Sequence, residues 1–240
     1  MSRVVPIFKR EFGGYFRTPV AYVFLVVFLM LSVGLAFFVG QFFDSNVASL
    51  ESYFTFHPWL FVFFGGAAGM RLWAEERKNG TIELLFTLPI TPLDAVLGKF
   101  LAAWAFLTIA ILLSFPMAIT VGFLGSPDWG VIATSYFGSI LMAGSFLAVA
   151  SLTSAFTRNQ VISFVISVCV NLVLVLMGWS VFNGAMERVM PQWMVDTVAN
   201  FSYMPHFEPF LKGMVDLKDV AFFLSLTVFC LFLNVLALER

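Results

Sequence analysis

The sequence predicts an all-α integral membrane protein with six transmembrane helices, preceded by one interfacial helix and interrupted by a short helix in a cytoplasmic loop. Hydrophobic residues make up 60% of the 240 residues and charged residues only 11%, whereas soluble domains carry about 25% charged residues. The apolar runs are long and do not alternate with polar residues, which favours helices over a transmembrane barrel. Cys169 and Cys230 both lie inside such runs, so no disulfide framework is indicated.

Residues 1–18 have the pattern of an amphipathic helix that lies on the cytoplasmic leaflet. One side of the helical wheel carries the apolar residues and the opposite side carries cations at seven-residue spacing, Arg3, Arg10 and Arg17. A disordered basic tail is the alternative, but the apolar spacing fits a helix better. Pro19 then turns the chain into the membrane.

Six apolar segments follow, each long enough to cross a hydrocarbon core of roughly 30 Å. The first has 21 residues without a charge and no persuasive cleavage site, so we interpret it as a span and not as a signal peptide. The second is the least regular, because His57 and Pro58 stand near its start and Arg71 near its end. The predicted spans are 20–40, 54–73, 100–123, 132–156, 161–182 and 220–238.

The distribution of cations sets the orientation. With a cytoplasmic N-terminus, ten lysines and arginines fall inside and three outside, so the positive-inside rule places both termini in the cytoplasm. Two polar regions are large enough to carry function: a cytoplasmic loop, 74–98, and an external stretch, 183–219. The external stretch mixes aromatic residues, methionines and prolines, which predicts short helices at the outer leaflet. Together these segments form one transmembrane domain, 1–240.

The sequence contains none of the common catalytic patterns. It has no GxxxxGK[ST] phosphate loop, no GxSxG elbow and no HExxH pair. The two histidines, His57 and His206, are predicted on the external side, where hydrogen bonding at the interface is the expected role. No span carries a carboxylate or lysine near its midpoint, as ion-coupled transporters usually do. We therefore expect no catalytic, cofactor or metal site in the chain and a driving energy supplied by a partner.

Small residues inside the spans predict close helix packing. Gly65 and Gly69 form a GxxxG pair in the second span, and Ser135 and Ser139 belong to a stripe in the fourth. The pattern does not decide whether these contacts form within one chain or between two chains.

The cytoplasmic loop contains the most distinctive local signal. Gly80 is expected to end one helix and Thr81 to cap another, which Pro89 stops after about two turns. Ile82, Leu85 and Phe86 share one side of this short helix, a face that suits either docking on another protein or resting on the membrane. The charged residues before it are expected to form exposed ion pairs: Glu75, Glu76, Arg77 and Lys78. A further helix is expected to start at Thr91, with Pro92 in its first turn.

The sequence resembles the permease subunits of type 2 ABC exporters, especially the branch associated with gliding motility and nitrous-oxide-reductase maturation. The resemblance covers nearly the whole chain and is most specific in the loop. The matching residues are Phe8-Lys9-Arg10-Glu11-Phe12, Tyr15-Phe16, Arg71, Glu75-Glu76-Arg77-Lys78, Gly80-Thr81-Ile82-Glu83-Leu84-Leu85, Pro89-Ile90, Leu97-Gly98-Lys99-Phe100, Gly125-Ser126-Pro127-Asp128-Trp129-Gly130, His206-Phe207 and the stretch 213–219.

This resemblance implies that the loop helix is a coupling helix that contacts a separate P-loop ATPase, which holds ATP and Mg. The expected assembly lies in the bacterial inner membrane and contains two ATPase copies and a second permease half, identical or homologous. An external accessory subunit is compatible with it, and nucleic acid is not an expected partner. The expected function is export or extrusion, and the alternative is a mechanotransmitting or anchoring complex that transports nothing. The implied ATPase-coupling residues are Glu75, Glu76, Arg77, Gly80, Thr81, Ile82, Glu83, Leu85 and Phe86.

Overall fold

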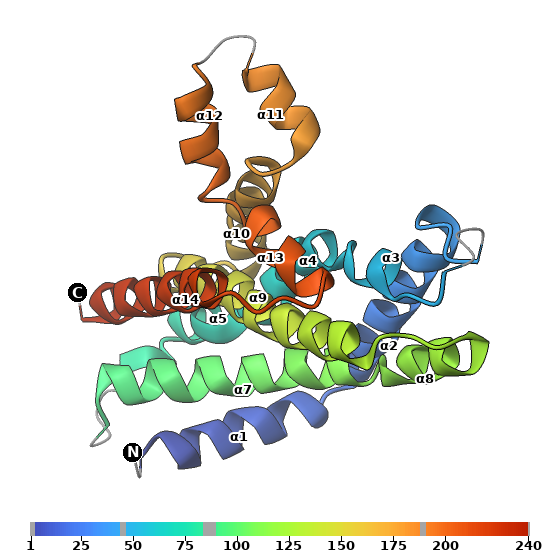
Figure 1. The fold of residues 1–240 in the computed structure, drawn as a ribbon. Coiled ribbons are helices and arrows are strands. Elements are labelled where there is room, and N and C mark those ends of the chain that lie inside the picture. Colours follow the sequence, from blue (N-terminus) through green and yellow to red (C-terminus); the bar gives the residue numbers. More distant parts are fainter. Residues whose placement is uncertain (1–2, 44–46, 84–89, 188–190, 240) are drawn as a thin grey trace.

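The computed structural model describes residues 3–43, 47–83, 90–187 and 191–239, and every regular element in these ranges is a helix. The predicted all-helical class is therefore confirmed. Figure 1 labels the elements. They are α1 (Val4–Phe16), α2 (Pro19–Gly34), the π-helix η1 (Leu35–Val39), α3 (Glu51–Phe54), α4 (His57–Gly69), α5 (Arg71–Asn79), α7 (Pro92–Leu112), α8 (Phe115–Leu124), α9 (Trp129–Ala155), α10 (Gln160–Leu176), α11 (Ser180–Met186), α12 (Gln192–Ala199), α13 (Tyr203–Leu211) and α14 (Leu217–Leu238).

Helix α9 is the centre of the bundle. It contacts α4, α5, α7, α10, α13 and α14, and most of its 27 residues are buried. Its many Gly, Ala and Ser residues let the neighbouring helices approach closely, as small residues do in membrane bundles. The two chain ends lie at the same end of the molecule, together with the end of α5 and the start of α7 (Figure 1). We call this the loop end.

Among the described residues, four helical stretches are long and apolar enough to cross a membrane: Pro19–Val39, Pro92–Leu124, Trp129–Ala155 and Leu217–Leu238. They coincide with the predicted first, third, fourth and sixth spans. The predicted second span, 54–73, is divided among three helices, and its main part, α4, has 13 residues, or about 20 Å of helix. The predicted fifth span corresponds to α10, an apolar helix of 17 residues. A multi-pass membrane protein is supported, and the count of six spans remains a prediction.

The GxxxG pair of α4 packs within the chain. A Cβ atom built on Gly65 would lie 2.9 Å from Cβ of Phe146, and one built on Gly69 would lie 2.5 Å from Cβ of Ala150. Both distances are shorter than real Cβ contacts allow, so only glycine permits this approach of α4 to α9. The sequence left open whether the glycine pair contacts a helix of its own chain or of a second chain. In the structure it contacts α9 of its own chain.

The predicted N-terminal helix is present as α1, and its apolar side packs along α7. A Cβ atom built on Gly98 would lie 2.7 Å from Cγ2 of Ile7, and the ring of Tyr15 stacks on Phe106 at 4.8 Å. The two helices run side by side in the same direction (Figure 1). The N-terminal helix is thus fixed to the helix that follows the cytoplasmic loop.

The predicted external stretch divides into two parts. Helices α11 and α12 project from the body (Figure 1), and the side chain of Trp193 on α12 is 68% exposed. Helix α13 instead joins the core through Tyr203, Phe207 and Phe210, which are all buried. Short helices are thus present in this stretch, and their location at the outer leaflet stays a prediction.

Candidate functional site

Helix α5 leads into the predicted coupling loop, and a single serine holds its beginning. Ser154 of α9 donates its hydroxyl proton to the carbonyl of Met70 at 2.8 Å and accepts the backbone N–H groups of Trp73 and Ala74, each at 3.0 Å. The first N–H groups of a helix have no partner within the helix. Ser154 therefore satisfies two of these N–H groups. It also holds the backbone at the break between α4 and α5 against the central helix α9.

Lys99 of α7 makes the second connection. Its ammonium lies 2.8 Å from Oε1 of Glu76 and 3.1 Å from the carbonyl oxygen of Leu72, both on α5. Oε1 of Glu11 on α1 lies 3.7 Å away. Lys99 is only 4% exposed, and a buried ammonium is tolerated where charge and hydrogen-bond partners surround it. One side chain therefore joins α1, α5 and α7.

Arg77 makes the third connection. Its Nη2 donates to the carbonyl oxygen of Ala237 at 3.0 Å, in the last turn of α14. The carbonyl end of a helix carries a partial negative charge, so a guanidinium is favourable there. Through Ser154, Lys99 and Arg77, the short helix α5 is anchored to helices from both ends of the chain.

Arg71 begins α5 and lies over an aromatic ring. Its guanidinium carbon is 5.2 Å from the ring centre of Tyr15 on α1, a cation–π arrangement. The Tyr15 hydroxyl donates to the carbonyl of Ala68 at 3.4 Å. Burial raises the pKa of Tyr15 to about 12, against the opposing effect of the Arg71 charge, so the phenol remains a donor at neutral pH.

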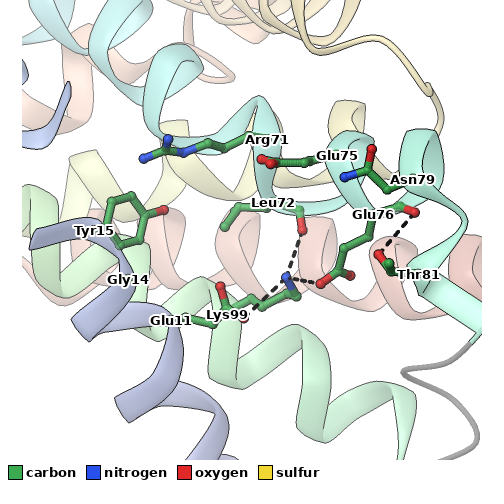
Figure 2. A pocket seen from close by; sticks show the side chains of 10 residues that line it. All are labelled: Glu11, Gly14, Tyr15, Arg71, Leu72, Glu75, Glu76, Asn79, Thr81 and Lys99. Carbon is green, nitrogen blue, oxygen red and sulfur yellow. Dashed lines mark hydrogen bonds and ion pairs between the residues drawn. The ribbon is translucent and has the colours of Figure 1, made fainter. Parts of the chain in front are cut away.

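These side chains border an open cavity of about 330 Å³ between α1, α5 and the start of α7. Figure 2 shows Arg71, Glu75 and Asn79 in succession along one side of it and Tyr15, Glu11 and Lys99 on the other. The lining residues are Glu11, Gly14, Tyr15, Arg71, Leu72, Glu75, Glu76, Asn79, Thr81 and Lys99.

The predicted ATPase-coupling residues do not share one role in the structure. Glu75 is exposed, whereas Glu76 and Arg77 are directed into the protein, where they meet Lys99 and Ala237. The expectation of exposed ion pairs is therefore wrong for these last two residues. A bundle of apolar helices brings a buried lysine and a helix end within their reach, and the linear sequence does not display either.

The local signal at Gly80 is confirmed, whereas the Thr81 hydroxyl donates back to the carbonyl oxygen of Glu76 at 3.5 Å, so a cap by Thr81 on the next helix stays a prediction. Gly80 ends α5 with φ +69°, the left-handed conformation that suits glycine. Thr81 to Glu83 are helical. Ile82 is half-buried against the core, and Glu83 is exposed. Leu85 and Phe86 lie outside the described residues, so the predicted apolar docking face is placed only at Ile82.

The helix after the loop starts as predicted. Thr91 caps α7: its hydroxyl accepts the backbone N–H of Asp94, while the Asp94 carboxylate accepts the backbone N–H of Thr91. Pro92 occupies the first turn. This reciprocal capping box fixes where the rigid helix resumes after the loop.

The serines of the predicted packing stripe make specific hydrogen bonds. Ser139 lies 2.9 Å from Nδ1 of His57, and Ser135 donates to the carbonyl of Phe210 at 3.3 Å. His57 is fully buried and packs inside the bundle, and its predicted location near the external interface stays a prediction. Within the described ranges, no group of three or more potential metal ligands comes together.

The sequence reasoning did not select Lys99, Glu11 or Ser154 as site residues. For Lys99 a signal existed, because a lysine at the edge of an apolar span needs a partner, and Glu11 and Glu76 supply it here. No sequence signal distinguishes Ser154 from the other serines of α9.

Comparison with known proteins adds one family assignment. Residues 43–217 match the family model described as "ABC-2 family transporter protein", which is more than half of the chain. No curated protein matches the chain. The matched region contains α4, α5, α7 and α9, and therefore most of the anchorage described above.

Proposed function

The chain belongs to the ABC-2 transporter family, and from this premise we propose that it is the membrane-spanning permease half of an ATP-driven exporter. In this proposal a separate P-loop ATPase docks on the loop after α5, and two permease halves and two ATPases form the complex. The complex lies in the bacterial inner membrane, with both termini cytoplasmic. The gliding-motility and nitrous-oxide-reductase-maturation branch is the proposed subfamily, on the loop and N-terminal motifs of the sequence.

The observation that carries the proposal is the anchorage of α5. A coupling element has to receive force at one end and pass it to the bundle at the other. Helix α5 ends at Gly80, next to the loop, and is tied to α9, α7 and α14 by Ser154, Lys99 and Arg77. A displacement of the loop by the ATPase is thus transmitted to helices that cross the membrane.

The proposed roles follow from the sequence pattern for docking and from burial for transmission. Ile82, with Leu85 and Phe86, shares one side of the loop helix and forms the docking contact, and burying one such apolar side chain is worth roughly 1.5 to 3 kcal/mol. Glu76 and Arg77 transmit force, because they connect α5 to Lys99 and to the end of α14. Glu75 and Glu83 are exposed, so they adjust the contact through weaker, screened interactions.

The test compares docking variants with transmission variants in the complex purified with its ATPase. Ile82→Ala with Leu85→Ala should release the ATPase from the membrane. Arg77→Met should retain the ATPase while weakening the link between ATP turnover and flux in proteoliposomes. The matched control for the docking variant is Phe123→Ala with Leu124→Ala, two exposed apolar residues at the end of α8.

Two results would overturn parts of this proposal. If the Ile82 and Leu85 variant keeps the ATPase as firmly as the parent, the loop helix is a connector and not a docking element. If the intact complex hydrolyses ATP and responds to Arg77→Met but drives no flux of any tested solute, the mechanotransmitting or anchoring function takes the place of export.

A further inference from the structure

The cavity between α1, α5 and α7 is lined by two opposite charges, Arg71 and Glu75, that form no ion pair with each other within the described residues. Lys99 is already engaged by Glu76, Glu11 and the Leu72 carbonyl. Arg71 and Glu75 also line the cavity, and no ion pair involves either of them within the described residues. They stand four residues apart in α5, which normally allows an ion pair, but the Arg71 guanidinium lies over Tyr15 instead.

Glu75 is the carboxylate that the cavity leaves accessible. Its side chain is exposed and lines the cavity, whereas Oε1 of Glu76 binds Lys99 and Oε2 of Glu76 is buried from solvent. Glu75 therefore offers carboxylate oxygens to an incoming N–H donor, and Arg71 offers a guanidinium to an incoming anion.

The spacing of Arg71 and Glu75 favours a zwitterionic ligand. The Cβ atoms of residues four apart on a helix lie about 5–6 Å from each other and both side chains line the same cavity, so Arg71 and Glu75 suit a ligand whose anionic and cationic groups are joined by a short linker. A phosphate fits the guanidinium, which forms paired hydrogen bonds with phosphate oxygens. A primary ammonium fits the Glu75 carboxylate, because it carries three N–H donors.

The position of the cavity points to a lipid as the source. Arg71 directly follows the apolar helix α4, and Lys99 stands where the apolar part of α7 begins. Pockets with basic side chains between helices on the cytoplasmic side bind lipid headgroups, and the placement of this cavity on that side rests on the orientation given in the proposed function. We propose that the cavity binds the phosphoethanolamine headgroup of a phospholipid, with its phosphate on Arg71 and its ammonium on Glu75.

The same residues disfavour a choline headgroup. A trimethylammonium group has no N–H donors for the Glu75 carboxylate, and it is usually held by aromatic faces. The aromatic ring that lines this cavity is Tyr15, and that ring is already contacted by Phe106 and by Arg71. The site therefore distinguishes phosphatidylethanolamine from phosphatidylcholine, and it distinguishes both from anionic phosphatidylglycerol, which leaves the Glu75 carboxylate unpaired.

Two adjacent glycines of α1 provide a steric test. A Cβ atom at Gly13 or at Gly14 would meet nothing within 4 Å, and only Gly14 lines the cavity. Leucine favours a helix more than glycine does, so neither replacement should impair folding. Gly14→Leu should fill the cavity and reduce retention of phosphatidylethanolamine, while Gly13→Leu should leave retention unchanged.

The measurement is native mass spectrometry of the full chain, equilibrated separately with dioleoyl phosphatidylethanolamine, phosphatidylcholine and phosphatidylglycerol. We expect preferential retention of phosphatidylethanolamine, weakened about tenfold by Arg71→Gln or Glu75→Gln, as for the loss of one charge-assisted hydrogen bond. Lys78→Gln is the control, because Lys78 is exposed on the same helix and does not line the cavity. Competition by glycerophosphoethanolamine would show whether a soluble headgroup suffices or whether the acyl chains are needed.

Equal retention of the three lipids, or unchanged retention in Gly14→Leu, would overturn the assignment. Preference for phosphatidylglycerol would overturn the role of the Glu75 carboxylate. The experiment uses the chain without its ATPase, so its failure would leave the coupling proposal intact. If Gly14→Leu released the ATPase from the complex without changing lipid retention, the cavity would be a protein contact instead.

Discussion

Lys99 and Glu76 form a nearly buried ion pair, with 2.8 Å between Nζ and Oε1, across the two helices that flank the predicted coupling loop. Their side chains are only 5% and 18% exposed, so this pair is much less screened than a surface pair. Because the loop begins after α5 and ends before α7, the pair closes the base of the loop. The ends of the loop are thus held at a fixed separation whatever contacts its tip.

The first prediction concerns this pair. Lys99→Met should destabilise the protein, because breaking one partner of a buried pair leaves an uncompensated charge at a cost of about 3 to 5 kcal/mol. It should also weaken the dependence of transport on ATP hydrolysis in the complex. Thermal unfolding in detergent and flux per ATP in proteoliposomes measure the two effects.

Lys78→Met and the double variant Lys99→Met with Glu76→Gln are the controls. Lys78 is exposed, so its loss should change neither measurement. Removing the charge of Glu76 as well should recover part of the stability lost in Lys99→Met. If Lys99→Met left the unfolding temperature unchanged, the ion pair between Lys99 and Glu76 would not stabilise the base of the loop.

The second prediction concerns the start of α5. Ser154→Ala removes one hydroxyl that serves three backbone groups, those of Met70, Trp73 and Ala74. A buried polar group without a partner costs about 1 to 3 kcal/mol, so the variant should unfold at a clearly lower temperature. Ser225→Ala is the matched control, since Ser225 is exposed on α14 and bonds only to its own helix. Equal melting temperatures for the two variants would contradict the role of Ser154.

The sequence predicted the helical class, four of the membrane spans and the local stops and starts at Gly80 and Thr91, because these depend on residue type and on near neighbours. It did not predict that α4 would be short, since apolar residues resume after Arg71 with Leu72 and Trp73. The break at Met70 is fixed by Ser154, 84 residues further along the chain. Such long-range hydrogen bonds carry no local signature.

The same reason explains the mixed result at the candidate site. Glu76 and Arg77 stand beside two other charged residues, a pattern typical of an exposed segment. Their burial is decided by Lys99 and by the end of α14, which only the folded bundle brings near. By contrast, the spacing of Gly65 and Gly69 predicted close helix packing, although GxxxG is common in apolar sequence and did not identify the partner helix.

The third prediction follows from that packing. Gly69→Ala should destabilise the protein, because its Cβ atom would lie 2.5 Å from Cβ of Ala150 and both belong to rigid helices. We expect a loss of about 1 to 3 kcal/mol, as for other overpacked cores. Gly34→Ala is the control, since a Cβ atom there meets nothing within 4 Å and alanine favours the helix. A variant at Gly69 as stable as the one at Gly34 would contradict the close approach of α4 and α9.

The last prediction concerns orientation, which follows from the ten-to-three distribution of cations. In a background with Cys169→Ser and Cys230→Ala, a cysteine at Asn79 should react with a membrane-impermeant thiol reagent only after the cells are opened. A cysteine at Trp193 should react in intact spheroplasts. Both positions are exposed, so access depends on the side of the membrane and not on burial. Labelling of the Asn79 cysteine from outside would reverse the orientation and, with it, the proposed docking of an ATPase on the loop after α5.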